Sequence, residues 1–256
     1  MRFANLAHTR LFLLIVLIAL AAAGPSASTD LPKVSAFAPA EDLLEQVRFF
    51  VGRVEESLAD ADDFDLAKQS RTFKDGNTIA ALALVLAVHD QAYPQKSAMP
   101  AVLRAAQSLA TVEDNHPRAK KALTEIKAAL AAEGMAEAAV RWEKVASLAA
   151  LMKQVPLIHS GLKRGVEGNR LARQAPRSAG QAAALAAIAQ VSALDPEYVK
   201  TAGDAETWHA CCVEMRDAAG EVNSAVHAKD EARVSGSMKR LAVSCDRCHA
   251  AFRRAP

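Results

Sequence analysis

Two cysteines and a histidine near the C-terminus have the spacing of groups that react together. Residues Cys245-Asp246-Arg247-Cys248-His249 form a C-x-x-C-H run. Such a run supplies two thiols that can add across the two vinyl groups of a haem, followed at once by an imidazole that can bind its iron. The motif predicts one covalent haem c, attached through Cys245 and Cys248, with His249 as an iron ligand.

Two other uses of a C-x-x-C pair need further sequence features that this sequence lacks. A thioredoxin-like redox pair should follow a strand in a βαβ pattern, and the sequence shows no such strand. A structural zinc site needs a second pair of ligands spaced about two to four residues apart, whereas Cys211 and Cys212 are adjacent. A disulfide between adjacent cysteines is strained, so we expect these two thiols to pack as small apolar residues. An intermolecular bridge through Cys211 is the alternative.

The N-terminus predicts export. After Arg2 and Arg10 comes an unbroken apolar run over 11–20, followed by three alanines at 21–23. This order is typical of a secretory signal peptide, and the run is shorter than the ~20 apolar residues that span a bilayer. We therefore expect residues 1–23 to be a signal peptide and the protein to be periplasmic. If the segment stays uncleaved, it anchors the protein to the membrane.

The remaining chain is predicted to be all-α. Glycine (11) and proline (10) are few, and apolar residues recur at alternating steps of three and four, as on one face of a bundle helix. Three helices with this spacing are expected at 145–162, 179–193 and 208–226, and a fourth helix follows them. Four such helices with short connections predict an antiparallel four-helix bundle over 141–256. The apolar face of the last helix contains Val234, Met238, Leu241, Cys245, Cys248 and Phe252. Both thiols of the motif are therefore expected on its buried face.

The end of the chain resembles a known family. A C-x-x-C-H run followed by Phe252 and Arg253 at the end of a helical chain is similar to the class II c-type cytochromes, the cytochrome c-prime family. Leu151-Met152-Lys153, early in the first helix of this bundle, and Thr207-Trp208, at the start of the third, resemble the low-spin, methionine-ligated members. The resemblance covers about residues 141–254.

The resemblance implies roles for individual residues. His249 would be the proximal iron ligand and Met152 the distal one, with the basic Arg253 near the proximal side. The first and last helices of an up-down bundle run antiparallel, so the predicted topology brings Met152 close to His249. Methionine at such a position is also common as core filler. In that case the distal side is open and the iron is five-coordinate, as in the gas-binding members.

Two residues in the first helix of this bundle affect the distal side. Pro156 cannot donate a hydrogen bond to the carbonyl of Met152, so we expect a kink or loosened turn there. His159 is the other candidate ligand, but two helical turns separate it from the level of Met152. We expect His159 to be an ordinary core or surface histidine.

The N-terminal half carries a degenerate internal repeat of the C-terminal half. Leu43–Val47 parallels Leu151–Val155, and further weak matches follow in the same order with nearly constant spacing. The first copy has no cysteine, and Leu44 occupies the position of the methionine. We therefore predict a linker over 24–40 and two tandem antiparallel four-helix bundles, 41–138 without haem and 141–256 with it.

Charge distinguishes the two halves. Residues 31–140 contain 12 Lys and Arg against 16 Asp and Glu, whereas residues 141–256 contain 17 against 12. Opposite net charge favours contact between the halves, although salt screens it beyond about 8 Å. Basic residues around the haem motif favour an acidic redox partner protein. Nucleic acid is not among the expected partners, and the resemblance leaves a homodimer open.

The predicted haem and its candidate ligands are compatible with three functions to different degrees. The first is a single-haem electron-transfer cytochrome, in which His249 and Met152 hold the iron. The alternative is a haem protein that binds small gases such as NO or CO at an open or Met-displaceable distal site. The third is a haem enzyme such as a peroxidase, for which the sequence offers no convincing distal acid–base pair. We expect the electron-transfer protein, and not an enzyme.

Overall fold

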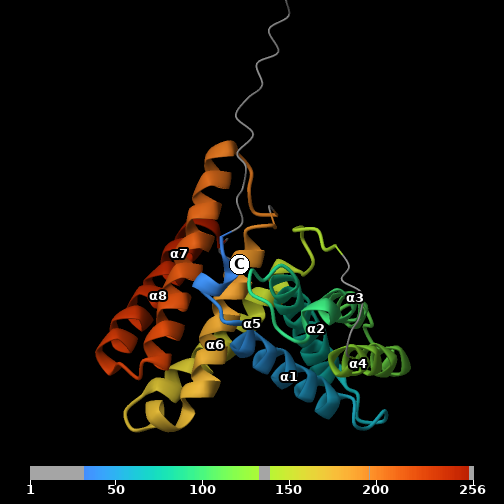
Figure 1. The fold of residues 1–256 in the computed structure, drawn as a ribbon. Coiled ribbons are helices and arrows are strands. Elements are labelled where there is room, and N and C mark those ends of the chain that lie inside the picture. The colour runs from blue at the N-terminus through green and yellow to red at the C-terminus, as the bar shows by residue number, and fades with distance from the viewer. Residues whose placement is uncertain (1–31, 133–138, 196, 254–256) are drawn as a thin grey trace, which may run out of the picture. The chain divides into compact units, whose positions relative to one another are not determined.

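The protein is helical throughout the part of the chain that the structure describes, which confirms the predicted all-α class. This computed structural model describes residues 32–132, 139–195 and 197–253 (Figure 1). The predicted signal peptide and residues 24–31 of the predicted linker lie outside that part. The α-helices are α1 (Ala40–Ser57), α2 (Leu66–Ala87), α3 (Met99–Leu109), α4 (His116–Ala131), α5 (Leu148–Val166), α6 (Arg170–Ser192), α7 (Ala202–His227) and α8 (Glu231–Phe252). No helix of the described residues is long and apolar enough to cross a membrane.

The centre of the fold is α6. Every residue from Ser178 to Ser192 is buried, and seven of the fifteen are alanines. Small side chains let neighbouring helices approach closely, and α6 packs against α1, α2, α5 and α7. One close approach to α1 is at Gly180, where a Cβ atom would lie 2.8 Å from Nε2 of Gln46 and 3.3 Å from the carbonyl oxygen of Asp42. A larger residue at Gly180 would therefore displace the Gln46 side chain and crowd the backbone of α1.

The last four helices follow one another as antiparallel neighbours. Each of the successive pairs from α5 to α8 packs closely, whereas α5 and α8 make few contacts with each other. Side chains of the residues before the helices fix three of the starts. Ser147 accepts a hydrogen bond from the amide of Ala150, Thr201 forms a capping box with Asp204, and Asp230 caps α8. These caps set where α5, α7 and α8 begin, and hence the level of the haem motif at the end of α8.

The two halves of the chain share buried polar contacts. Residues from Pro32 onward form one compact unit. Asp75 on α2 is fully buried; its Oδ2 accepts from Nε of Arg53 at 3.0 Å, and its Oδ1 from Nε2 of Gln154 on α5 at 2.7 Å. Asn77 Oδ1 accepts from the amide of Ser147 at 2.7 Å, just before α5 begins. The interface between the halves thus depends on buried hydrogen bonds of individual residues and on packing more than on the opposite net charge of the halves.

The internal repeat is matched in part by the order of the helices. Helix α5 begins 108 residues after α1 (148 less 40), and α6 begins 104 residues after α2 (170 less 66). These offsets agree with those of the repeat in the sequence. The division into a haem-less bundle over 41–138 and a haem bundle over 141–256 stays a prediction.

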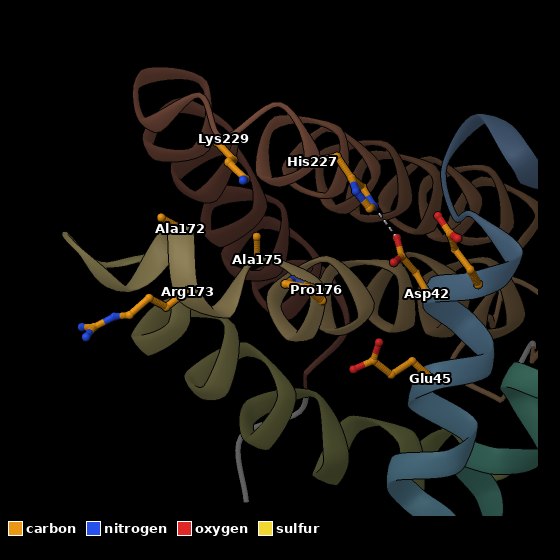
Figure 2. A pocket seen from close by; sticks show the side chains of 9 residues that line it. Asp42, Glu45, Ala172, Arg173, Ala175, Pro176, His227 and Lys229 are labelled. Carbon is orange, nitrogen blue, oxygen red and sulfur yellow. Dashed lines mark hydrogen bonds and ion pairs between the residues drawn. The ribbon is translucent and has the colours of Figure 1, made fainter.

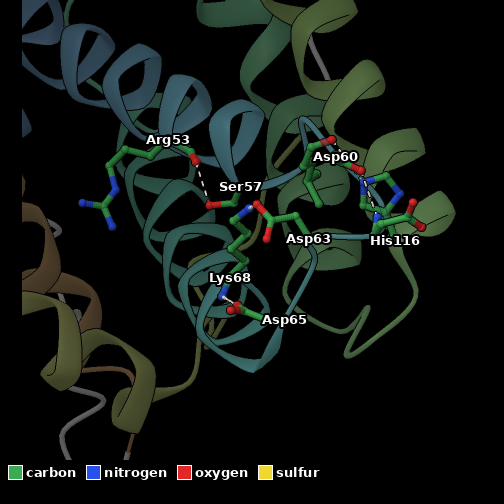
Figure 3. A network of polar contacts seen from close by, with 9 residues as sticks. Arg53, Ser57, Asp60, Asp63, Asp65, Lys68 and His116 are labelled. Carbon is green, nitrogen blue, oxygen red and sulfur yellow. Dashed lines mark hydrogen bonds and ion pairs between the residues drawn. The ribbon is translucent and has the colours of Figure 1, made fainter.

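The acidic run between α1 and α2 makes local contacts (Figure 3). Oδ1 of Asp65 accepts from the amide of Lys68 at 2.9 Å and caps α2, while the Lys68 ammonium pairs with Asp63. Oδ1 of Asp60 accepts from the amide of Asp62 at 3.0 Å. These carboxylates therefore stabilise the turn and the start of α2, as side chains at helix N-termini commonly do.

Candidate functional site

Helix α8 carries all three residues of the C-x-x-C-H motif in its last turns. Cys245 and Cys248 are half-buried, and His249 is exposed. Since the thiols are three residues apart on a helix, they lie on the same side, one turn from each other. Two thiols therefore project from one side of α8, and the imidazole projects from the position next to it.

The buried face of α8 differs from the one that we expected. Its fully buried residues are Val234, Ser237, Leu241 and Ser244. Ser237 and Ser244 can face the core because each hydroxyl donates to a carbonyl of the same helix, Arg233 O at 2.7 Å and Leu241 O at 2.8 Å. Met238 and Cys245, predicted on this face, are only half-buried at its edge. The two thiols, which we predicted on the buried face, are half-buried, because α5 does not cover this edge of α8 closely.

A small apolar cluster, which adjoins the main core at Met152, contains Met152 and Cys248. Leu148, Trp208 and Cys212 form its buried part, and Met152, Cys248 and Phe252 pack against them. The rings of Trp208 and Phe252 meet edge to face with centroids 5.1 Å apart. The helices α5, α7 and α8 thus bring the thioether of the predicted distal ligand and a thiol of the motif into one apolar environment.

Helix α5 continues through Pro156 without interruption. The side chain of Pro156 is exposed, whereas Met152, one turn earlier, is half-buried in the apolar cluster. The proline therefore does not interrupt the helix, and the kink or loosened turn that we expected stays a prediction. The carbonyl of Met152 still lacks its usual helical donor, because proline has no N–H.

A groove of about 480 Å³ lies between the later part of α5 and the earlier part of α8. His159 lines it, and Nε2 of this ring is buried without a hydrogen-bond partner among the described residues. Burial, and secondarily the charge of Lys163, lower the pKa of His159. The other groove residues include Val166, Val234, Met238, Lys239 and Ala242. His159 therefore belongs to this groove rather than to the apolar cluster around Met152.

Burial keeps the thiols near the motif protonated. Desolvation, together with the neighbouring thiols, raises the pKa of Cys212 and of Cys248 to about 12, and desolvation also raises that of Cys245. Cys211 and Cys212 are both buried, with 3% and 6% of their surface exposed, which confirms that they pack as small apolar residues.

Two of the basic residues near the motif pair with acidic residues of α7. Nη1 of Arg247 lies 3.1 Å from a carboxylate oxygen of Glu214, and Arg240 pairs with Glu221. Arg253 is exposed, and its amide donates to the carbonyl of His249 at 2.9 Å. The structure therefore places Arg253 one turn after His249, as the predicted proximal role requires, and reduces the free basic charge around the motif.

A second hollow, which sequence reasoning missed, lies where α1, α6 and α7 meet (Figure 2). Its volume is about 540 Å³. The buried Asp42 accepts from Nδ2 of Asn223 at 2.6 Å and lies 2.7 Å from Nε2 of His227. No sequence pattern links His227 to a residue 185 positions away. The other residues that line this hollow are Glu41, Glu45, Ala172, Arg173, Ala175, Pro176 and Lys229.

Replacing Trp208 by alanine should destabilise the end of the bundle. The change would open a cavity in the apolar cluster and remove the hydrogen bond from Nε1 to the carbonyl of Ser192, 3.1 Å away. Truncations of a buried aromatic residue cost about 3–5 kcal/mol of unfolding free energy. Urea denaturation of the haem-free protein measures this loss. Trp208→Phe keeps the ring packing and should cost only about 1 kcal/mol. Equal, small losses for both variants would mean that this cluster adds little to stability.

No protein-family model, curated protein or solved structure matches this chain. Among the described residues, no group of three or more His, Cys, Asp and Glu side chains is arranged to hold a metal ion directly. The chemistry of the C-x-x-C-H motif and the helices around it is thus the basis for assigning a function.

Proposed function

We propose that this protein is an exported c-type cytochrome that carries a single covalent haem and transfers electrons. The observation that carries the proposal is the C-x-x-C-H motif on the last helix, with Cys248 and Met152 in one apolar cluster. The resemblance to the class II c-type cytochromes, with an all-helical fold, supports the same function. Bound haem would supply one centre that gains and loses a single electron.

The residues of the site fit a covalently held haem. Cys245 and Cys248 offer two half-buried thiols one turn apart, and the exposed ring of His249 is free to take up a metal ligand position. Few contacts hold α5 against α8, so these helices have room to separate around a flat group. The apolar surroundings formed by Leu148, Trp208 and Phe252 exclude water, which tunes the potential of an iron centre.

The proposed distal ligand favours electron transfer over gas binding. Met152 is half-buried against the same cluster as Cys248 and so lies on the correct side of α5. A thioether opposite an imidazole raises the reduction potential of haem iron, as suits an electron carrier. If Met152 does not bind the iron, an open distal site that takes NO or CO is the second function to consider.

Expression in a host that attaches haem c tests the proposal. The purified protein should be red, and its mass should exceed that of the polypeptide by one haem that withstands acid extraction. The variant with both Cys245→Ala and Cys248→Ala should lose the covalent haem completely, because no thiol remains to form a thioether bond. The variant with Cys211→Ala and Cys212→Ala also loses two thiols, both of them buried, and is the matched control. This variant should keep the covalent haem. A colourless wild-type protein of unmodified mass would refute the proposed function.

A further inference from the structure

The groove between α5 and α8 offers an apolar surface to a bound molecule. Its volume of about 480 Å³ lies within the range of small-molecule binding sites. Val234 is a buried lining residue, Val166 and Met238 are half-buried, and Ala242 is exposed. Since α5 and α8 make few contacts with each other, apolar surface of both helices stays open to the groove.

Two basic side chains line this groove, one from each helix. Lys163 on α5 and Lys239 on α8 are exposed, and neither makes an ion pair among the described residues. Two ammonium groups beside one groove repel each other, whereas a carboxylate between them is attracted to both. The groove is therefore suited to an anionic group.

The two acidic residues of the groove do not neutralise these lysines. Oε2 of Glu167 lies 3.6 Å from Nη2 of Arg170. Glu231 is in the first turn of α8, where the N-terminus of the helix stabilises a negative charge. Lys239 follows Glu231 by eight residues, or about two helical turns, and so lies further along the groove.

His159 adds an uncharged polar group near the lysines. Burial, and secondarily the charge of Lys163, lower the pKa of His159, so its ring is neutral at pH 7. Its buried Nε2 has no partner among the described residues, which is rare in folded proteins. A titratable group with a shifted pKa in an apolar groove is typical of binding sites.

We propose that this groove binds a small amphipathic carboxylic acid, whose carboxylate lies between Lys163 and Lys239 and whose apolar body packs against the valines and Met238. The inference does not rest on the proposed haem, because no residue of the C-x-x-C-H motif lines the groove.

Calorimetric titration with 4-phenylbutyrate tests the proposal, using protein from the haem-attaching host. This acid combines an apolar ring and chain with one carboxylate, and we expect saturable binding with a dissociation constant below about 1 mM. The alcohol 4-phenylbutan-1-ol has the same apolar body but no charge. It should bind about tenfold more weakly or worse, because it forms no charge-assisted hydrogen bonds with the lysines.

Two variants locate the carboxylate. The variant with Lys163→Gln and Lys239→Gln should bind the acid about tenfold more weakly and the alcohol as before. The variant with Lys153→Gln and Lys200→Gln is the matched control, because it also removes two exposed lysines, neither of which lines the groove. This control should bind both compounds like the wild type.

A third variant and a spectroscopic signal locate the apolar body. Ala242→Phe adds a ring at an exposed position of the groove, so it should weaken the binding of both compounds without removing a core side chain. The ring resonances of His159, identified by their absence in His159→Gln, should shift when the acid binds.

Four results would overturn the proposal. They are no saturable binding of the acid up to about 10 mM, equal binding of the acid and the alcohol, equal losses in the two lysine variants, and unchanged binding in Ala242→Phe.

Discussion

Met152→Ala is expected to convert the haem-loaded protein from a low-spin to a high-spin form. The thioether is the proposed sixth ligand of the iron, and alanine offers no donor in its place. The far-red absorption band of methionine-ligated ferric haem should disappear, and the reduced protein should bind carbon monoxide readily. The reduction potential should fall by an amount on the order of 100 mV, because the stabilisation of the ferrous state by the thioether is lost. Absorption spectra and a redox titration measure these changes.

Met238→Ala is the matched control for that prediction. Met238 is also a half-buried methionine, but it lines the groove between α5 and α8 and lies outside the cluster around Trp208. The far-red band should remain in this variant. If it vanished there and survived in Met152→Ala, another residue would be the ligand. If the wild-type protein were already high-spin and bound carbon monoxide, the gas-binding function would replace electron transfer.

Asp75→Ala should cause the largest loss of stability among single changes outside the site. It would leave the guanidinium of Arg53 and the amide of Gln154 without their common partner at a fully buried position between the halves. Breaking a buried pair in this way costs about 3–5 kcal/mol of unfolding free energy. Urea denaturation of the haem-free protein, followed by circular dichroism, measures the loss.

Asp75→Asn separates the charge of this group from its hydrogen bonds. Desolvation raises the pKa of Asp75 in spite of the opposing effect of Arg53. A raised folded-state pKa means that the contribution of this group is fully present below its unfolded value of 3.8 and is lost as the pH rises through the folded value. Asparagine resembles the protonated form, so Asp75→Asn should cost less than Asp75→Ala at pH 7. Equal losses for the two variants would show that the ion pair with Arg53, which both of them remove, is dominant.

The helices of the C-terminal half could be predicted from sequence because their apolar period is local. The expected stretches at 145–162 and 208–226 fall almost entirely within α5 and α7. The exact buried face of α8 could not be predicted. This face includes Ser237 and Ser244, which can be buried because each hydroxyl donates a hydrogen bond to a carbonyl of its own helix. A prediction from apolar residues alone treats these serines as exposed and therefore places Met238 and Cys245 on the buried face instead.

The contacts of the candidate site were predictable only in part. The C-x-x-C-H motif is local, and the antiparallel order of α5 and α8 follows from short connections, so the proximity of Met152 to the end of α8 could be expected. The packing of Cys248 against the cluster of Trp208 and Cys212 depends on the rotation of α7 against α8, which no single-helix pattern contains. The buried bonds of Asp42 to Asn223 and His227 join residues more than 180 positions apart and left no signal in the sequence.

The alanine-rich α6 has a consequence for how the protein would work as an electron carrier. From Ser178 to Ser192 this helix is buried, and it packs against helices of both halves, so neither half can move without straining the other. A rigid surrounding changes its geometry little when the charge of a buried centre changes. If the protein carries the proposed haem, its N-terminal half would serve as a brace that keeps the reorganisation energy of electron transfer low.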